Sequence, residues 1–324
     1  MEYTTLGGTG LDVSRICLGC MSFGRGRYDW SLEESESREI IDRAIDLGIN
    51  FFDTANIYSF GESEQILGNS LEGYERDAQV IASKVYFQMD EANPNSGGLS
   101  RKTIEQEVER SLDRLGVDTV DLYQIHRWDY DTPVEVTLRA LDDVVSRGKA
   151  RYIGASSMWA YQFSEALHTS ERLGLERFAT MQNQYSLAYR EEEREMLPLC
   201  EREDVGVIPW SPLAKGFLAR PHEEMEATER GRTDSLLHDR PYDAEGNIEV
   251  NERIQELADD WDVSMAQIAL AWILHKPPVD APIVGVTSVE QLEEAVEALE
   301  LDLSDSDVQY LEEPYEPLPV TGHA

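Results

Sequence analysis

A carboxylate, a phenol, a lysine and an imidazole stand where short apolar runs of the sequence end. Asp53 directly follows Phe51-Phe52, Tyr58 comes five residues later, and Lys84 and His126 each end a later run of the same kind. Side chains of these types at the ends of buried strands can exchange protons or stabilise a charge that develops on a substrate. For Asp53 and Tyr58 alone, a helix cap and a ring packed at the surface explain the same residues.

Lys84 gives a reason to expect that the four side chains meet. A lysine at a strand end costs desolvation unless an opposite charge pairs with it, and Asp53 is the natural partner on a neighbouring strand. An ammonium beside Tyr58 favours the phenolate, so we expect the pKa of Tyr58 to lie below its ordinary value of about 10. His126 would donate a hydrogen bond to a carbonyl oxygen. The structural alternative is an ion pair that closes the mouth of the fold, beside a histidine satisfied within the core.

Short β-type runs alternate with amphipathic helical stretches along the chain. The expected strands lie around residues 16–18, 51–52, 80–82, 122–125, 152–155, 179–181, 205–209 and 281–284. The expected helices lie around 35–47, 62–71, 103–115, 133–147, 161–173, 191–202, 251–275 and 289–299, with an interruption near Val263-Ser264. A short final helix and a Pro-rich tail are expected after them, and a hairpin over 3–13. Eight such pairs favour an α/β fold of the (β/α)8 TIM barrel type over an open doubly wound sheet. We predict a single domain over residues 1–324, with an N-terminal β-hairpin and long loops at the C-terminal face.

The carboxyl ends of barrel strands meet at one face, where barrel enzymes carry their chemistry. The acid–base candidates lie at such ends, as do Ser156-Ser157, Gln182, Trp210 and the segment from Gly285 to Thr287. The connection that Trp210 opens runs to about residue 248, which is too long for a turn and typical of a functional loop.

The chain is strongly acidic along its whole length. It has 64 Asp and Glu against 28 Lys and Arg, for a formal charge of -36 over 324 residues. This balance argues against nucleic acid and anionic membranes as partners. Many carboxylates with few lysines are typical of proteins from a salt-rich cytoplasm, so we expect a halophilic protein whose activity and melting temperature rise with salt.

Targeting and metal signals are weak. The N-terminus lacks the pattern of a signal peptide and no apolar run reaches membrane-spanning length, so a soluble, cytoplasmic protein is expected. Cys17 and Cys20 form a C-x-x-C, but no second pair follows at zinc spacing. His222 and His238 have no carboxylate or cysteine partners at ligand spacing. We predict no metal site.

Several segments resemble the aldo-keto reductase superfamily. They are Asn50-Phe51-Phe52-Asp53-Thr54-Ala55 with Tyr58, Ser83-Lys84, and Asp121-Leu122-Tyr123-Gln124-Ile125-His126. Gln182-Asn183-Gln184-Tyr185 and Trp210-Ser211-Pro212-Leu213-Ala214-Lys215-Gly216 are similar to later signatures of that family. The segment 311–315 resembles a microbial branch that includes aryl-alcohol dehydrogenase relatives. The similarity covers almost the whole chain.

The resemblance implies a barrel that binds a nicotinamide cofactor without a Rossmann fold and reversibly reduces an aldehyde or ketone to an alcohol. It makes Tyr58 the general acid, tuned by Asp53 and Lys84, and makes His126 the residue that orients the carbonyl. Trp210 would supply an aromatic face for the nicotinamide ring. The implied cofactor-binding residues are Met21, Asp53, Ser156, Ser157, Gln182, Trp210, Ser211, Leu213, Gly216, Gly285, Thr287, Gln291 and Glu294.

Two positions depart from the family pattern. Ser157 stands where many members have Asn, so a shorter hydroxyl faces the carboxamide and would need a bridging water. The segment 285–294 lacks the Lys or Arg that often grips the 2′-phosphate of NADP. Thr287, Ser288, Gln291 and a helix N-terminus could hold that phosphate, although Glu290, Glu293 and Glu294 oppose it. The resemblance therefore implies NADP(H), and NAD(H) or dual use stays open.

Aromatic residues near the expected mouth favour carbonyl substrates with an apolar or aromatic body, or else they pack beneath long loops. They are Trp30, Tyr86, Phe87, Trp128 and Trp159. A nucleotide-binding regulatory subunit with little turnover is the alternative function, and the full acid–base set argues against it. A hydrolase with paired carboxylates fits badly, because Asp53 has Lys84 as its expected partner.

Overall fold

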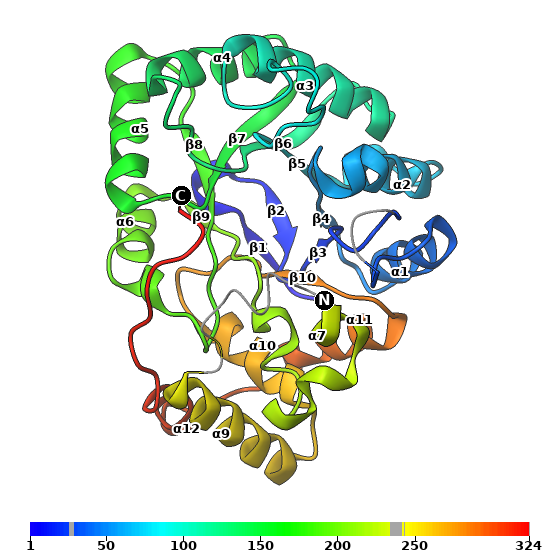
Figure 1. Ribbon diagram of the computed structural model, residues 1–324, viewed down its shortest axis with the longest axis vertical. Helices are drawn as coiled ribbons and strands as arrows, with labels where there is room; N and C mark the ends of the chain where they lie inside the picture. Colours follow the sequence, from blue (N-terminus) through cyan, green and yellow to red (C-terminus); the bar gives the residue numbers. More distant parts are fainter. Residues whose placement is uncertain (26–28, 234–241, 243, 324) are drawn as a thin grey trace.

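Eight parallel strands curl into a barrel with helices around it (Figure 1). The computed structural model describes residues 1–25, 29–233, 242 and 244–323. The barrel strands are β3 (Cys17–Gly19), β4 (Phe51–Asp53), β5 (Val80–Val85), β6 (Val120–Ile125), β7 (Ala150–Ser156), β8 (Phe178–Gln182), β9 (Gly206–Val207) and β10 (Ile283–Gly285). Bridges from Val207 to Val279 and from Trp210 to Ile283 join the β9 side to the β10 side. The predicted (β/α)8 fold is confirmed.

The helices follow the predicted alternation. Those of the described residues are α1 (Glu34–Asp46), α2 (Glu62–Leu71), α3 (Arg101–Leu115), α4 (Val134–Ser146), α5 (Ala160–Leu173), α6 (Met196–Glu203), α7 (Glu229–Thr233), α9 (Glu245–Trp261), α10 (Met265–His275), α11 (Val289–Glu297) and α12 (Asp305–Glu312). Two boundaries differ clearly from expectation: α6 begins at Met196, after a short 3-10 turn, and α9 begins at Glu245. None of the helices in the described part of the chain combines the length and apolar character that crossing a bilayer requires.

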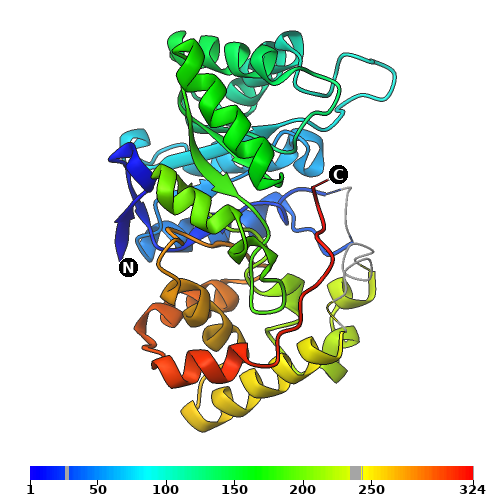
Figure 2. The ribbon, with the colours of Figure 1, turned by 90° about the vertical axis from the view of Figure 1, so that its left-hand side faces the viewer.

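The predicted hairpin closes the end of the barrel away from the site. Strand β1 (Tyr3–Thr5) pairs antiparallel with β2 (Asp12–Ser14), and Leu6 between them is fully buried within the inner core. Figure 2 shows this hairpin on one side of the barrel and the C-terminal tail reaching the other side. The cavity described below therefore opens at the carboxyl ends of the strands.

The interior changes from apolar to polar along the strands. Inward positions alternate along each strand, so Val80, Ala82 and Lys84 of β5 share one side, and the first two belong to the inner apolar cluster. In β6, Leu122 and Gln124 share a side in the same way. The lower layers are thus a packed core, and the polar layer at the carboxyl ends is where side chains can reach a ligand.

Asp280 couples the hairpin to the barrel and makes stability depend on pH. Its Oδ2 accepts hydrogen bonds from the backbone N–H groups of Gly7 at 3.0 Å and Val207 at 3.2 Å, and burial raises its pKa from 3.8 to about 6. A folded-state pKa above the unfolded value means that the folded protein holds this proton more tightly. The stability that the proton provides is present below pH 4 and lost as pH rises through about 6.

Asn at this position cannot lose the proton, so we expect the stability of Asp280→Asn relative to the wild type to increase by about 1.5 kcal/mol from pH 5 to pH 8. Denaturant unfolding of both proteins at several pH values measures this difference. Asp302→Asn removes the same charge from an exposed position and is the control for the overall charge of the chain. A stability difference that stays constant from pH 5 to 8 would contradict the role of Asp280.

Candidate active site

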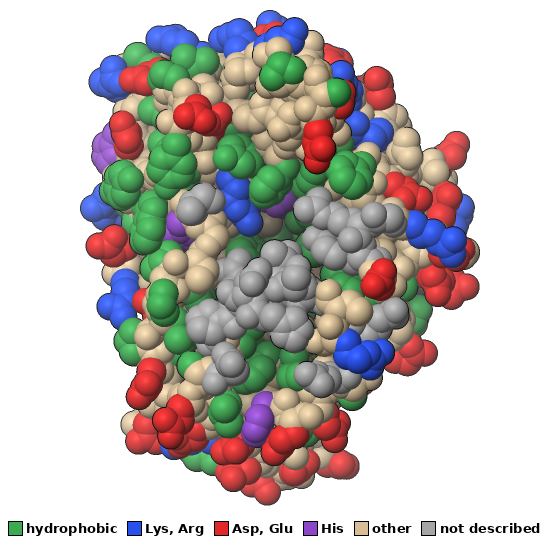
Figure 3. Space-filling view, in the orientation of Figure 1, with side chains coloured by type: hydrophobic (Ala, Val, Ile, Leu, Met, Phe, Trp, Pro, Cys, Tyr) green, Lys and Arg blue, Asp and Glu red, His purple; other side chains and the backbone are tan. Residues whose placement is uncertain are grey.

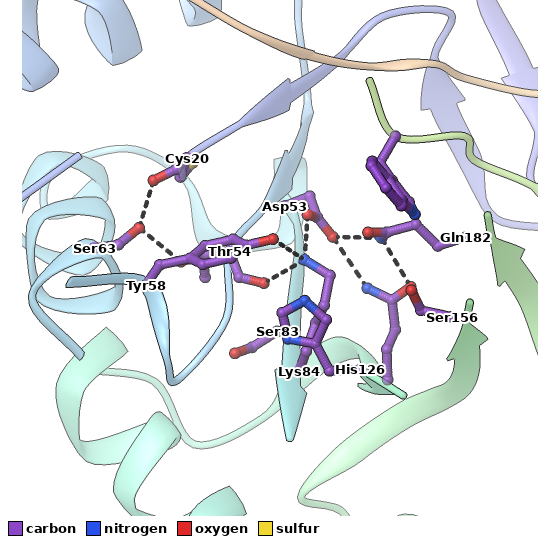
Figure 4. A network of polar contacts seen from close by, with 12 residues as sticks. Cys20, Asp53, Thr54, Tyr58, Ser63, Ser83, Lys84, His126, Ser156 and Gln182 are labelled. Atoms are coloured by element: carbon purple, nitrogen blue, oxygen red, sulfur yellow. Dashed lines mark hydrogen bonds and ion pairs between the residues drawn. The ribbon is translucent and has the colours of Figure 1, made fainter. Parts of the chain in front are cut away.

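The ammonium of Lys84 is held by three oxygens at the end of β5. Its Nζ lies 2.5 Å from Asp53 Oδ1, 2.9 Å from the Thr54 carbonyl oxygen and 3.2 Å from the Tyr58 hydroxyl (Figure 4). Lys84 is fully buried and Asp53 is buried beside it. Burial opposes the lysine charge, but Asp53 and Tyr58 outweigh burial, so the pKa of Lys84 is raised and the ammonium stays charged. The predicted meeting of these three side chains is confirmed.

The second oxygen of Asp53 is bound by two glutamines. Asp53 Oδ2 accepts hydrogen bonds from Gln124 Nε2 at 3.0 Å and from Gln182 Nε2 at 2.9 Å. Gln182 Nε2 also lies 3.1 Å from Gln124 Oε1. The carboxylate thus directs both amide nitrogens inward and leaves Gln182 Oε1 as the group that can accept a hydrogen bond from a ligand.

Tyr58 keeps its proton more firmly than expected. Burial raises the pKa of its phenol, and the Lys84 ammonium lowers that pKa only in part, so the net shift is upward. The expectation of a lowered pKa is wrong because desolvation of the phenolate outweighs the attraction of one ammonium that Asp53 already neutralises. At neutral pH the phenol is protonated, which is the form that a proton donor needs.

Aromatic packing fixes His126 beside Tyr58. The two rings meet edge to face with centroids 5.7 Å apart, and Phe87 contacts the other side of His126 with centroids 4.9 Å apart. Arg127 follows directly and its guanidinium lies over Phe87, 5.5 Å from the ring centre. The phenol and the imidazole are therefore presented together, as two groups that could address one substrate oxygen.

These groups form one end of a cavity of about 820 Å³, a size typical of small-molecule sites. On this face, acidic side chains gather mainly at the periphery and hydrophobic ones around the centre (Figure 3). The predicted residues that line the cavity are Met21, Asp53, Tyr58, His126, Ser156, Gln182, Trp210, Ser211, Leu213, Gly216, Gly285, Thr287, Gln291 and Glu294. Residues from the ends of distant strands are thus brought to one elongated site.

Comparison with known proteins decides the family. A model of the aldo/keto reductase family matches residues 15–316. The chain belongs to this family. A Schizosaccharomyces pombe protein named provisionally as an aryl-alcohol dehydrogenase is 46% identical, over 99% of this chain and 97% of its own. The versiconal hemiacetal acetate reductase of Aspergillus parasiticus is 44% identical over 98% of both chains. An aldo-keto reductase of Alternaria alternata is 40% identical, over 99% of this chain and 94% of its own.

Family membership and the reductase names of these relatives support oxidoreductase activity on carbonyl compounds. They agree with the predicted resemblance to a branch that includes aryl-alcohol dehydrogenases. The family in general uses NAD(P)H, which the long cavity could accommodate.

Ser157 lies just outside the lining of the cavity in this aldo/keto reductase. It does not line the cavity, and its backbone has a φ of 51°. Its N–H donates to Asn183 Oδ1 at 2.8 Å, and its Oγ accepts from Trp210 Nε1 at 3.1 Å. The Ser157 hydroxyl thus holds the Trp210 indole and lies 3.2 Å from the hydroxyl of Ser156, and both of these neighbours line the cavity.

The connection after β9 supplies cations that the sequence analysis missed. Lys215, Arg220 and Arg230 line the same cavity as Gln291 and Glu294. Burial, and then the nearby charge of Arg230, lower the pKa of Arg220. Two guanidinium groups so close together favour an anion between or beside them. Lys215 belongs to the segment 210–216 that resembles the family, whereas the only signal for Arg220 and Arg230 was their place in an unusually long loop.

Backbone strain is concentrated in the same connection. Ser211, Ala214 and Lys215 all have positive φ values, of 55°, 46° and 58°, which residues other than glycine rarely adopt. Gly216 follows with a φ of 99°. Such conformations persist where surrounding contacts hold them and often mark binding loops.

The aromatic expectation is met at two positions. Trp30 and Phe87 line the cavity, whereas Tyr86, Trp128 and Trp159 do not. Tyr86 packs edge-on against Phe87, and Trp159 is 39% exposed. Trp30 and Phe87 are therefore the aromatic residues of this group that could contact a substrate.

The cysteines of this aldo/keto reductase are packing residues. Burial raises the pKa of the Cys17, Cys20 and Cys200 thiols, which makes all three poor nucleophiles and poor ligands. A search of the described residues finds no cluster of His, Cys, Asp and Glu that could hold a metal ion. His238 lies outside the described residues.

Proposed function

We propose that the protein is an NAD(P)H-dependent carbonyl reductase in which Tyr58 is the general acid. The observation that carries the proposal is the contact of the Lys84 ammonium with both the Tyr58 hydroxyl and Asp53 at the inner end of the cavity. This contact places a fixed positive charge where negative charge would appear after Tyr58 gives up its proton. An ion pair with a purely structural role would not require a phenol as its third partner.

When bound, the nicotinamide supplies the hydride that adds to the carbonyl carbon. Tyr58 donates its proton to the carbonyl oxygen, and Lys84 stabilises the phenolate that remains. His126 orients the same oxygen by hydrogen bonding. In the reverse reaction the phenolate accepts the proton of the alcohol, so the same four residues serve both directions.

The cavity offers suitable groups along the length of a dinucleotide. Gln182 Oε1 and Ser156 lie near the acid–base end and could bind the carboxamide, while Trp210 could cover one face of the ring. Lys215 and Arg220 could bind the pyrophosphate, beside the strained loop that Ser211 opens. Glu293 opposes a bound phosphate less than the sequence suggests, because its charge is paired with that of Arg43.

We propose NADP(H) as the preferred cofactor, with the 2′-phosphate held by Thr287, Gln291 and the cations of the connection after β9. Gln291 Oε1 accepts a hydrogen bond from the Thr287 backbone at 2.8 Å, which directs its amide nitrogen outward. Calorimetric titrations with NADPH and NADH are expected to show NADPH binding at least about tenfold more tightly, as for a phosphate held by charge-assisted hydrogen bonds. Tighter binding of NADH would overturn this preference.

The activity itself is tested by following NADPH oxidation with 4-nitrobenzaldehyde, methylglyoxal and simple sugars. We expect turnover with the aromatic aldehyde, because Phe87 and His126 form an apolar wall at the substrate end. If the wild type and Tyr58→Phe bound nucleotide equally well but were equally inactive on the whole panel, the regulatory alternative would replace the proposal.

We also propose that the protein works in a salt-rich cytoplasm. The formal charge of -36 makes the folded chain repel itself, and salt screens that repulsion. The melting temperature in molar KCl is expected to exceed that in dilute buffer by about 10 °C or more, which corresponds to a few kcal/mol for a chain of this size. Scanning calorimetry at several KCl concentrations measures the effect. Full stability in dilute buffer would count against it.

A further inference from the structure

The C-terminal tail reaches a buried carboxylate near the site. Residues 313–323 leave α12, run along the side of the barrel and end near its open face (red in Figures 1 and 2). There His323 Nε2 lies 3.3 Å from Glu192 Oε1, and both side chains are buried. Among the described residues, this is the side-chain contact within 4 Å that Glu192 makes with a basic residue. A carboxylate removed from water needs such partners, so the position of the tail and that of Glu192 depend on each other.

Asn183 carries the connection from Glu192 into the barrel. The other oxygen of Glu192 accepts a 2.6 Å hydrogen bond from Asn183 Nδ2, which leaves Asn183 Oδ1 as an acceptor. This oxygen accepts the backbone N–H of Ser157 at 2.8 Å. Asn183 is only 3% exposed, so water cannot easily replace either bond. The carboxylate thus fixes which way round the Asn183 amide lies.

Ser157 needs the support that Asn183 gives. Its φ of 51° is rare for any residue other than glycine, and such a conformation persists only where neighbouring contacts hold it. In this conformation the Ser157 hydroxyl accepts the indole N–H of Trp210 at 3.1 Å. Trp210 in turn lines the cavity. Four consecutive contacts therefore join the tail to the proposed nicotinamide face.

We propose that Asn183 and Glu192 are positioning residues for the cofactor. His323 is the third, because it docks the tail against Glu192. The inference rests on the proposed nicotinamide site. Because coupling between two sites is reciprocal, a tail that supports cofactor binding must itself be held more firmly when the cofactor is bound. Ordinary structural contacts would not make the tail respond to the nucleotide.

The first test compares NADPH affinity among variants by calorimetry. Asn183→Ala and Glu192→Ala are expected to weaken binding about tenfold, within the usual range of coupling between sites, and His323→Ala about threefold, just below that range. Glu192→Gln keeps an oxygen for Asn183 Nδ2 and is expected to stay within about twofold of the wild type. The effect should appear in the KM for NADPH, with kcat at saturating NADPH nearly unchanged.

Tyr130→Phe is the matched control. The Tyr130 hydroxyl donates to the backbone carbonyl of His323 at 2.8 Å, so this variant loses a tail contact without losing a side chain of the connection. We expect its NADPH affinity to fall by less than that of His323→Ala, because the contact between the His323 ring and Glu192 is kept. An equal loss in Tyr130→Phe and His323→Ala would mean that tail docking in general matters, and would overturn the role given to His323.

Hydrogen exchange of the wild type provides a second test that needs no variant. Amides of residues 313–323 are expected to exchange at least about threefold more slowly with saturating NADPH than without it. Unchanged exchange of the tail, or a folded Asn183→Ala that binds NADPH like the wild type, would overturn the inference while leaving the proposed function intact. A wild type that binds neither NADPH nor NADH would remove both.

Discussion

Tyr58→Phe is expected to lower kcat for aldehyde reduction by about a thousandfold, because the variant keeps the ring and loses the proton that the carbonyl oxygen must receive. The ring is held by its edge-to-face contact with His126, which the substitution preserves. The Kd for NADPH should therefore stay close to the wild-type value. Stopped-flow measurement of NADPH oxidation in a single turnover separates this loss from any change in product release.

His126→Gln is the companion variant for this prediction. It keeps a hydrogen-bond donor but removes the ring that packs against Tyr58 and Phe87. A loss of about tenfold to a hundredfold is expected, smaller than that of Tyr58→Phe, because orientation is impaired and the acid remains. If Tyr58→Phe kept more than a tenth of the wild-type kcat, another group would have to be the acid.

Lys84→Met is expected to reduce both stability and turnover. It leaves the Asp53 carboxylate buried with no cation, and breaking a buried pair in this way costs about 3–5 kcal/mol of unfolding free energy. The Lys84 ammonium is also the main influence that lowers the pKa of Tyr58, so its loss raises that pKa further. The phenol becomes a weaker acid, and we expect kcat to fall about a hundredfold or more.

The double variant Asp53→Asn with Lys84→Met separates the two effects. It removes both charges, so most of the stability should return, whereas turnover should stay as low as in Lys84→Met. Urea unfolding gives the first quantity, and the pH dependence of kcat gives the second. An unchanged pH–rate profile in Lys84→Met would return the Asp53 and Lys84 pair to a structural role.

Much of the acid–base site was predictable because its side chains stand where buried strands end, and the ends of parallel barrel strands meet at one face. A charged or polar residue that ends a buried strand has few places to lie, and this placed Asp53, Lys84 and His126 correctly at one face. Gln124 was missed although it carried a signal: it stands two residues after the inward-facing Leu122, so it points to the same inner side of β6.

Other features depended on contacts that a sequence does not reveal. The upward shift of the Tyr58 pKa reflects how completely the phenol is desolvated, which depends on packing from several loops. The hydroxyl of Ser157 is taken up by the Trp210 indole, and Ser157 stays outside the cavity lining, although its position directly after β7 suggested a lining residue. Arg220 and Arg230 reach the cavity from a long connection whose path no local pattern predicts.

Lys84 has a further consequence for the supply of protons. The three N–H groups of its ammonium donate to oxygens of Asp53, Thr54 and Tyr58. Lys84 therefore has no N–H left to bond a water molecule that could deliver a proton. Under the proposed mechanism, each reduction takes one proton from Tyr58. The replacement must therefore come from the cavity side of the phenol, along the path by which the substrate enters and the product leaves. Tyr58 is then reprotonated through the same opening by which the alcohol product leaves. An alcohol that stays bound therefore delays both product release and reprotonation of Tyr58.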